Sequence, residues 1–241
     1  MSRVTAILPA AGLGTRMGGE KPKQFLQLDG VPVLLFTLRR LAACPAITDF
    51  VIATRGEEID SVSASIASEI PGLRVRVTRG GDTRQDSVAR ALVDVPAEAD
   101  LILVHDAVRP LVTLDQIERV IGEADACDAA ILGIPAMDTV KEVKRATPQG
   151  GGSDVALILA TIPRERVVLA QTPQVFRASL LLEAFASASQ DGVTASDEAG
   201  LVERLGRDVR VVVGSERNLK ITRPGDIQLA EFYLLQERAA R

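Results

Sequence analysis

Residues 4–24 read VTAILPAAGLGTRMGGEKPKQ, an apolar run that opens into a glycine-rich loop. The apolar residues up to Leu8 predict a buried strand, and the loop that follows carries Arg16, Lys21 and Lys23. Glycines let backbone N–H groups approach a ligand closely, and successive N–H groups form an anion-binding nest. Because the cationic side chains add full charge to these partial charges, the stretch predicts a polyphosphate site and therefore a nucleotide.

Neither of the two common phosphate-loop patterns is present. The third glycine of a dinucleotide-binding fingerprint is replaced by Met17, and the Gly-Lys-Ser/Thr of a P-loop does not occur here. An NAD-binding oxidoreductase is therefore disfavoured. The alternative to a phosphate-binding loop is a flexible surface turn with solvated charges. The strand that precedes the loop argues against this alternative.

Composition limits the class of protein. The 241 residues fit one α/β domain, and we expect a single domain over residues 1–241. Hydrophobic residues make up 46% but aromatic residues only 3%, which favours an aliphatic, mostly parallel sheet and disfavours base-stacking binders of single strands. A net charge of −4 predicts no nucleic-acid partner.

The cysteines and the N-terminus indicate where in the cell the protein is expected. Cys44 and Cys127 lie in apolar surroundings without metal-ligand spacing, which predicts small buried thiols in a reducing cytoplasm. The N-terminal apolar run is too short to span a membrane and leads into charged residues. We therefore expect no signal peptide, no membrane partner and a cytoplasmic location.

Apolar runs alternate with amphipathic stretches along the chain. The runs predict strands at Val4–Ala10, Phe50–Ala53, Arg74–Val77, Leu101–His105 and Ala129–Ile134. Apolar residues at helical spacing predict helices at Val33–Ala43, Glu58–Ser68, Arg84–Val93 and Leu114–Glu123. This alternation predicts a doubly wound sheet, which binds its ligand at the carboxyl ends of its strands.

Residues 137–160 break this rhythm. Two alternating stretches flank a glycine-rich tip, which predicts a β-hairpin that is either a surface excursion or an arm packed on a second subunit. Beyond it we expect a short strand, two helices, a strand and a closing helix, at Val167–Leu169, Ala178–Ala188, Asp197–Leu205, Val209–Val213 and 224–237.

Three further segments carry residues suited to chemistry. Asp106 follows a strand and could hold a divalent cation against phosphate oxygens, or could simply cap a helix or pair with Arg109. His105 is the only histidine and cannot form a triad or a metal cluster alone. Gly81 and Ser87 surround a helix start and could read a base edge, with Asp82 or Thr83 as the N-cap.

The segments together resemble the 2-C-methyl-D-erythritol 4-phosphate cytidylyltransferases of the non-mevalonate isoprenoid route. The resemblance extends from Ile7 to Tyr233 and rests on an ordered set of motifs. They are Ala-Ala-Gly-x-Gly-x-Arg-Met, Pro-Lys-Gln at 22–24, Gly-Gly-Asp-x-Arg-x-Asp-Ser, Val-His-Asp-Ala-x-Arg-Pro, Asp-Thr-Val-Lys at 138–141, Gln-Thr-Pro-Gln at 171–174, Ser-Asp-Glu-Ala at 196–199 and Asn-x-Lys-x-Thr-x-Pro.

The resemblance implies a Rossmann-like nucleotidyltransferase fold with a protruding hairpin arm, which forms a homodimer. It implies transfer of CMP from CTP to 2-C-methyl-D-erythritol 4-phosphate, with Mg²⁺ as cofactor and release of pyrophosphate. The implied catalytic residues are Arg16, Lys23, Arg164 and Lys220, and the implied metal ligand is Asp106. The nucleotide would be bound by Ala10, Ala11, Gly12, Gly14, Gly81, Asp82 and Ser87, and the acceptor by Arg109, Thr139, Thr172 and Thr222, some of them across the dimer.

Several alternatives stay open. A cytidylyltransferase for another polyol phosphate, such as ribitol 5-phosphate, shares the same phosphate-binding residues. A molybdopterin or hexose-1-phosphate nucleotidyltransferase matches the segment at 80–87 less well, and a catalytically silent nucleotide-binding protein would not need Arg16, Lys23 and Asp106 together. The tip at 147–154 also looks longer than is usual in the family.

Overall fold

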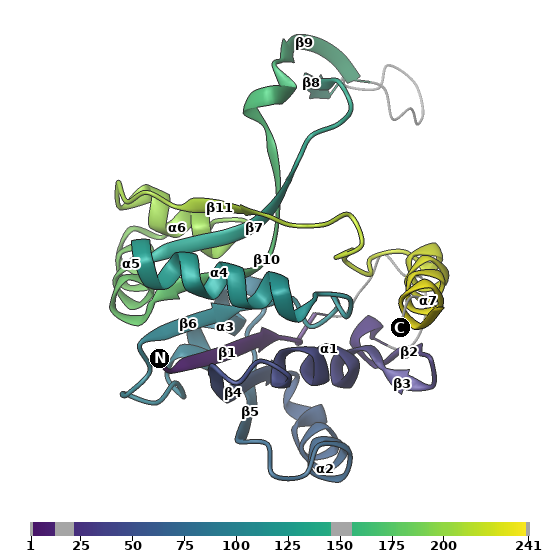
Figure 1. Ribbon diagram of the computed structural model, residues 1–241. Helices are drawn as coiled ribbons and strands as arrows, with labels where there is room; N and C mark the ends of the chain where they lie inside the picture. Colours follow the sequence, from purple (N-terminus) through teal and green to yellow (C-terminus); the bar gives the residue numbers. More distant parts are fainter. Residues whose placement is uncertain (1, 13–21, 146–155, 240–241) are drawn as a thin grey trace.

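A seven-stranded mixed sheet forms the centre of the computed structural model (Figure 1), which describes residues 2–12, 22–145 and 156–239. The strand order is β11-β7-β10-β6-β1-β4-β5. Their bounds are β1 Val4–Pro9, β4 Ile47–Thr54, β5 Val75–Arg79, β6 Leu101–Val104, β7 Ala129–Pro135, β10 Val168–Arg177 and β11 Arg210–Val213. All neighbouring pairs are parallel except those that involve β10. The predicted doubly wound, mostly parallel sheet is confirmed.

Two layers of helices cover the sheet, one on each face. Along β1, Ala6 and Leu8 contribute to one apolar cluster and Ile7 to the other, as successive side chains of a strand alternate between faces. The first cluster packs α1 Val33–Ala42, α2 Ile59–Glu69 and α4 Leu114–Cys127 against the sheet. The second packs α3 Arg84–Leu92, α5 Ala178–Asp191 and α6 Glu198–Arg204.

The closing helix, α7 Pro224–Ala239, lies apart from both layers (Figure 1). It packs in a third apolar cluster, which also contains Leu28, Val108 and Ile221. Leu28 belongs to a small hairpin of β2 Gln27–Leu28 and β3 Val31–Pro32. Helix α7 therefore joins three segments that are distant in sequence.

Helix starts follow local sequence signals. Thr83 and Thr113 each cap a helix through a reciprocal capping box, with Asp86 and Gln116 as the respective partners. Asp197 caps α6 by accepting the Gly200 N–H. The helix bounds predicted from apolar spacing agree with the observed bounds to within a few residues.

The predicted strand Val167–Leu169 is wrong in its length, because β10 continues to Arg177 and pairs antiparallel with both β6 and β7. Pro173 suggests a break, since proline cannot donate a ladder hydrogen bond. The strand accommodates it at a register shift between Ala170 and Gln174. Cys127 is only partly buried, unlike the buried Cys44, so the expectation of two buried thiols is half correct.

The predicted hairpin at 137–160 appears as β8 Val140–Arg145 and β9 Ala156–Ile162, which pair antiparallel. It lies between β7 and β10 in the chain and projects away from the body in Figure 1. The tip, 146–155, lies outside the described residues. No helix in the described parts of the chain is both long enough and apolar enough to span a bilayer.

His105 joins the end of β6 to β10. Its Nδ1 lies 3.0 Å from the Thr172 hydroxyl, and its Nε2 lies 3.1 Å from the Arg109 carbonyl oxygen. A carbonyl oxygen can only accept, so Nε2 carries the proton and the Thr172 hydroxyl donates to Nδ1. The same hydroxyl accepts the Asp106 N–H at 3.0 Å. Burial lowers the pKa of His105 to about 4, so the ring is neutral at pH 7.

We expect His105 to resist titration in the folded protein. The ordinary pKa of a histidine is 6.5, so between pH 6.5 and about 4 the unfolded chain binds a proton that the folded chain does not. As the pH is lowered through that window, the free energy of unfolding should fall by about 1.4 kcal/mol for each pH unit. Because the chain has one histidine, its imidazole proton resonance can be followed directly by NMR.

A resonance that titrates near pH 6.5 in the folded state would contradict this assignment. His105→Gln supplies the control, because glutamine keeps a donor and an acceptor but does not bind a proton in this range. Its free energy of unfolding should depend less steeply on pH between 6.5 and 4.

Candidate functional site

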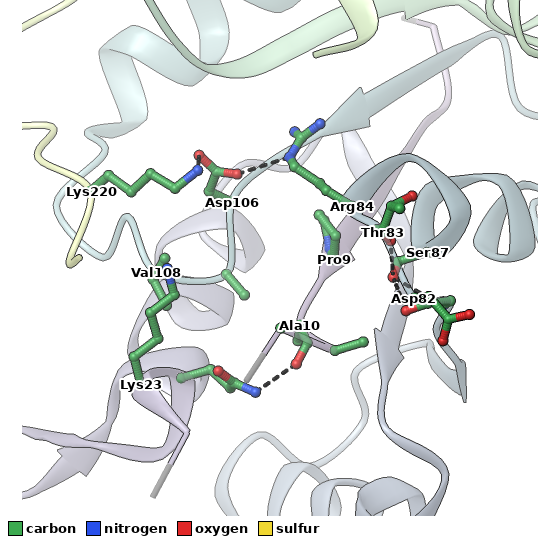
Figure 2. A pocket seen from close by; sticks show the side chains of 15 residues that line it. Pro9, Ala10, Lys23, Asp82, Thr83, Arg84, Ser87, Asp106, Val108 and Lys220 are labelled. Atoms are coloured by element: carbon green, nitrogen blue, oxygen red, sulfur yellow. Dashed lines mark hydrogen bonds and ion pairs between the residues drawn. The ribbon is translucent and has the colours of Figure 1, made fainter. Parts of the chain in front are cut away.

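A cavity of about 240 Å³ lies at the carboxyl ends of β1, β5 and β6. Strand β1 pairs with β4 on one side and β6 on the other, so the chain changes direction across the sheet at this point. Open α/β sheets bind their ligands in the crevice outside such a switch point. Figure 2 shows Lys23 and Lys220 on one side of the cavity, Arg84, Thr83 and Ser87 on the other, and the end of β1 between them.

The structure brings together residues from most of the predicted binding segments. Of the predicted site residues, those that line the cavity are Ala10, Ala11, Gly12, Lys23, Gly81, Asp82, Ser87, Asp106 and Lys220. Gly14 and Arg16 lie outside the described residues. The residues that line the cavity and had not been predicted to bind a ligand are Pro9, Gln24, Thr83, Arg84, Ala107 and Val108.

The wall formed by residues 80–87 is close-packed. A Cβ on Gly80 would lie 2.5 Å from Ala11 Cβ, and one on Gly81 would lie 2.2 Å from Asp86 Cβ. Both glycines are therefore required by close approach of the backbone. The Gly81 N–H donates to the Ser87 hydroxyl at 3.0 Å, and that hydroxyl donates to the Thr83 carbonyl at 2.9 Å. Ser87 is thus held in one orientation at the cavity wall.

Lys23 is carried into the cavity by a short helical turn, Lys23–Phe25. The neighbouring Gln24 is 2% exposed and donates from Nε2 to the Ala10 carbonyl oxygen at 2.7 Å. This bond ties the turn to the end of β1. The position of Lys23 is therefore fixed by a buried hydrogen bond that links it to the first segment of the site.

Asp106 is buried among three cations. Its Oδ1 lies 3.2 Å from Nε of Arg84, and its Oδ2 lies 3.1 Å from Nε of Arg109 and 3.0 Å from Nζ of Lys220. Burial acts to raise the pKa of Asp106, but the charges of Lys220, Arg84 and Arg109 outweigh it and hold the pKa well below its usual range. The carboxylate is therefore ionised at neutral pH.

Arg84 extends this network to a second carboxylate. Its Nη1 lies 2.7 Å from Oε1 and 2.9 Å from Oε2 of Glu198, which is 1% exposed. Burial raises the pKa of Glu198, and the charge of Arg84 acts in the opposite direction. Three cations and two carboxylates leave one excess positive charge in the network, and Lys23 is a further cationic side chain in the cavity wall. The cavity is thus suited to an anion.

Four predicted acceptor residues lie outside this lining. Arg109 touches the network through Asp106 and donates from Nη1 to the Asn218 carbonyl oxygen at 2.7 Å. The Thr172 hydroxyl is buried between His105 and the Asp106 N–H. The Thr222 hydroxyl donates to Asp226 at the start of α7. Thr139 is exposed beside the hairpin.

Arg164, predicted to be catalytic, also lies away from the lining. It is exposed beside the hairpin and donates from Nη1 to the Met137 carbonyl oxygen at 2.6 Å. A role at an acceptor site stays a prediction for all five residues, Arg109, Thr139, Arg164, Thr172 and Thr222.

The most informative residues missed from the sequence are Arg84 and Glu198. Arg84 lies inside the motif at 80–87, and Glu198 inside the motif at 196–199, but the sequence offers no sign that they pair across 114 positions. The only feature of the sequence that could have identified them is that each motif contains a charged residue. In the described residues, no three histidine, cysteine, aspartate or glutamate side chains lie close enough to bind a metal ion together.

Comparison with known proteins gives one consistent result. A model of the family IspD, 2-C-methyl-D-erythritol 4-phosphate cytidylyltransferase, matches residues 4–236. A protein of that name from Acidobacterium capsulatum is 54% identical over 240 residues, which cover 97% of this chain and 98% of the relative. Another from Solibacter usitatus is 48% identical over 244 residues and 98% of each chain.

Solved structures agree. The crystal structure of 4-diphosphocytidyl-2C-methyl-D-erythritol synthase from Anaerococcus prevotii superimposes with a TM-score of 0.81 at 27% identity, over 97% of this chain and 99% of that one. The 2-C-methyl-D-erythritol 4-phosphate cytidylyltransferase from Thermus thermophilus gives 0.74 at 35% identity, over 96% and 98%. On the strength of the family match and these full-length relatives, the chain belongs to the 2-C-methyl-D-erythritol 4-phosphate cytidylyltransferase family.

Proposed function

We propose that this protein transfers CMP from CTP to 2-C-methyl-D-erythritol 4-phosphate, releasing pyrophosphate and 4-diphosphocytidyl-2-C-methyl-D-erythritol. Family membership supports this reaction. The structural observation that carries it is the cavity at the ends of β1, β5 and β6, where Arg84 and Lys220 contact the ionised Asp106 and Lys23 lines the wall. A site of this charge accepts a polyphosphate and an anionic acceptor together.

The reaction needs no general base from the protein. The second pKa of a phosphate monoester is about 6, so the acceptor oxygen is already anionic at neutral pH. That oxygen forms a bond to the α-phosphorus of CTP while the bond to the bridging oxygen of pyrophosphate breaks, and the leaving group carries the charge away. The single histidine is buried, neutral and bonded through both ring nitrogens. Catalysis then depends on positioning and on cations.

The cationic side chains have distinct places in this scheme. Lys23 lines the cavity next to the end of β1, where the backbone of Ala10 and Ala11 would meet the nucleotide. We assign Lys23, together with Arg16, to the α-phosphoryl oxygens and the departing pyrophosphate. Lys220 lines the cavity beside Asp106, and we assign it to the acceptor phosphate.

We also propose that Asp106 holds a divalent cation, Mg²⁺, jointly with phosphate oxygens of CTP. A magnesium ion is commonly bound through one or two carboxylates plus substrate phosphates, so a single ionised aspartate in the cavity fits it. When bound, the ion neutralises charge on the phosphates. Asp106 contacts three cations in the structure, and these would share its oxygens with the ion.

A homodimer through the hairpin arm is the remaining part of the proposal. Residues of β8, β9 and the neighbouring ends of the sheet expose large apolar side chains, namely Val143, Leu157, Ile158, Leu159, Val168, Leu169, Val211 and Val213. An isolated two-stranded hairpin is marginal in water, and closed two-fold dimers are the commonest assembly. In such a dimer Thr139 and Arg164 would serve the acceptor site of the neighbouring subunit.

The reaction is tested by pyrophosphate release with four nucleoside triphosphates against a panel of polyol phosphates. CTP should be preferred over UTP, because cytosine presents an amino donor where uracil presents a carbonyl, and mismatched buried polar groups cost about 1–3 kcal/mol each. Equal turnover with UTP at subsaturating concentrations would contradict the nucleotide assignment. Faster turnover with ribitol 5-phosphate than with 2-C-methyl-D-erythritol 4-phosphate would move the protein to the alternative acceptor.

Lys23→Ala should lower kcat by about 10²–10³-fold, the loss typical of one strong transition-state contact. The midpoint of thermal unfolding should change little, because Lys23 is partly exposed at the cavity wall. Arg74→Ala is a matched control, since this exposed cation precedes β5 at the opposite end of the strand from the cavity. Near-normal kcat for Lys23→Ala would remove the residue from the catalytic set.

The double substitution Leu157→Ser, Leu159→Ser should give monomers in sedimentation analysis and raise KM for the acceptor while CTP still binds. Both side chains are more than half exposed on β9, so their loss costs little inside one subunit. Val93→Ser, at the end of α3, is the control for removing an exposed apolar side chain. A variant that stays dimeric with an unchanged acceptor KM would leave the arm as a surface excursion.

A further inference from the structure

Glu198 is a buried carboxylate to which the reaction above gives no part. It is the first residue of α6, it is 1% exposed, and both of its oxygens accept from Nη1 of Arg84. Glu198 does not line the cavity, whereas Arg84 does. An ionised group removed from water in this way needs strong compensation, which the guanidinium supplies.

The first turn of α6 and the segment before it are held in place by two glutamines. Asp197 accepts from Nε2 of Gln174 on β10 at 2.8 Å, and Oε1 of Gln174 accepts the Ala199 N–H at 3.1 Å. On α3, Gln85 donates to the Val193 carbonyl oxygen and accepts the Ala195 N–H. Glu198 and Arg84 thus face each other from two helix starts that are tied to the sheet and to each other.

Arg84 divides its guanidinium between two carboxylates. Nη1 is occupied by Glu198, and Nε contacts one oxygen of Asp106 at 3.2 Å. Nη1 contacts both oxygens of Glu198, which holds the planar guanidinium in place, and Nε on the same group then reaches Oδ1 of Asp106. Oδ2 of Asp106 is contacted by Arg109 and Lys220.

We propose, on the basis of the reaction inferred above, that Glu198 is a positioning residue: it fixes Arg84 and through it the orientation of the Asp106 carboxylate in the cavity. Stability alone does not explain why Glu198 and Arg84 form a buried ion pair, because such a pair is often no more stabilising than apolar residues of similar volume. The chain Glu198–Arg84–Asp106 instead leads from a helix outside the cavity to the carboxylate at its centre (Figure 2 shows the Arg84–Asp106 contact).

The test is a double-mutant cycle on kcat and on KM for CTP, with Glu198→Gln, Arg84→Gln and the double variant. Glutamine keeps the shape of glutamate but loses the charge that restrains Arg84. Glu198→Gln should lower kcat at least tenfold and change KM for CTP less than threefold. The reason is that the substitution alters the orientation of the Asp106 carboxylate, which would lie beside the reacting phosphates. In the Arg84→Gln background the same substitution should change kcat less than twofold.

Glu203→Gln is the matched control, because Glu203 lies on the same helix and is exposed. It should leave kcat unchanged. Equal fold-losses from Glu198→Gln with and without Arg84 would show a merely structural role and overturn the proposal, as would wild-type kcat in Glu198→Gln. If the wild-type protein itself releases no pyrophosphate from CTP and acceptor, the proposed function fails instead, so the two failures are distinguishable.

A second variant covers the case in which Glu198→Gln does not fold. Arg84→Lys keeps a positive charge beside Glu198, but a single ammonium group cannot contact Glu198 and Asp106 in the geometry of the guanidinium fork. It should lower kcat at least tenfold while circular dichroism and the midpoint of thermal unfolding stay near the wild-type values. An unchanged kcat in Arg84→Lys would overturn the link between the two carboxylates.

Discussion

The buried carboxylate of Asp106 is the constraint on which the rest of the site depends. A carboxylate with 5% exposure is stable only if charged or hydrogen-bonding partners replace the water it has lost. Three cations do so, and they come from a helix start (Arg84), the loop after β6 (Arg109) and the segment before α7 (Lys220). Because each partner must reach the same two oxygens, the relative positions of these segments are closely defined.

Apolar packing beneath the site makes that convergence possible. The third cluster joins Leu28 from the hairpin after Lys23, Val108 from the loop after Asp106, and Ile221 beside Lys220, all against Ala230 and Leu234 of α7. Non-directional burial thus brings together the segments that carry Lys23, Asp106 and Lys220, and the ion pairs of Asp106 then fix their orientation. The cationic groups are therefore in place before a substrate binds, which is what electrostatic catalysis requires.

The sequence predicts the parts of this molecule that depend on local patterns. Alternating strands and helices follow from apolar spacing, and the cavity wall at residues 80–87 follows from Gly80, Gly81 and the capping residue Thr83. Strand β10 is underpredicted, because Pro173 interrupts the local signal and the strand is stabilised by pairing with distant neighbours. The Arg84–Glu198 pair has no local signal, since its geometry exists only after α3 and α6 pack on the same face.

The chain carries a net charge of −4, yet its cavity gathers cations. The excess of positive charge is local, and it is held by carboxylates that are themselves buried rather than by solvent. A free cluster of lysine and arginine would repel itself and disperse into water, whereas Asp106 and Glu198 keep the cations close together and unscreened. The same two acids that neutralise most of the charge therefore set the positions of the remaining charge, which in the proposed reaction would act on a phosphate. This is why acidic residues at the centre of an anion site are consistent with its chemistry.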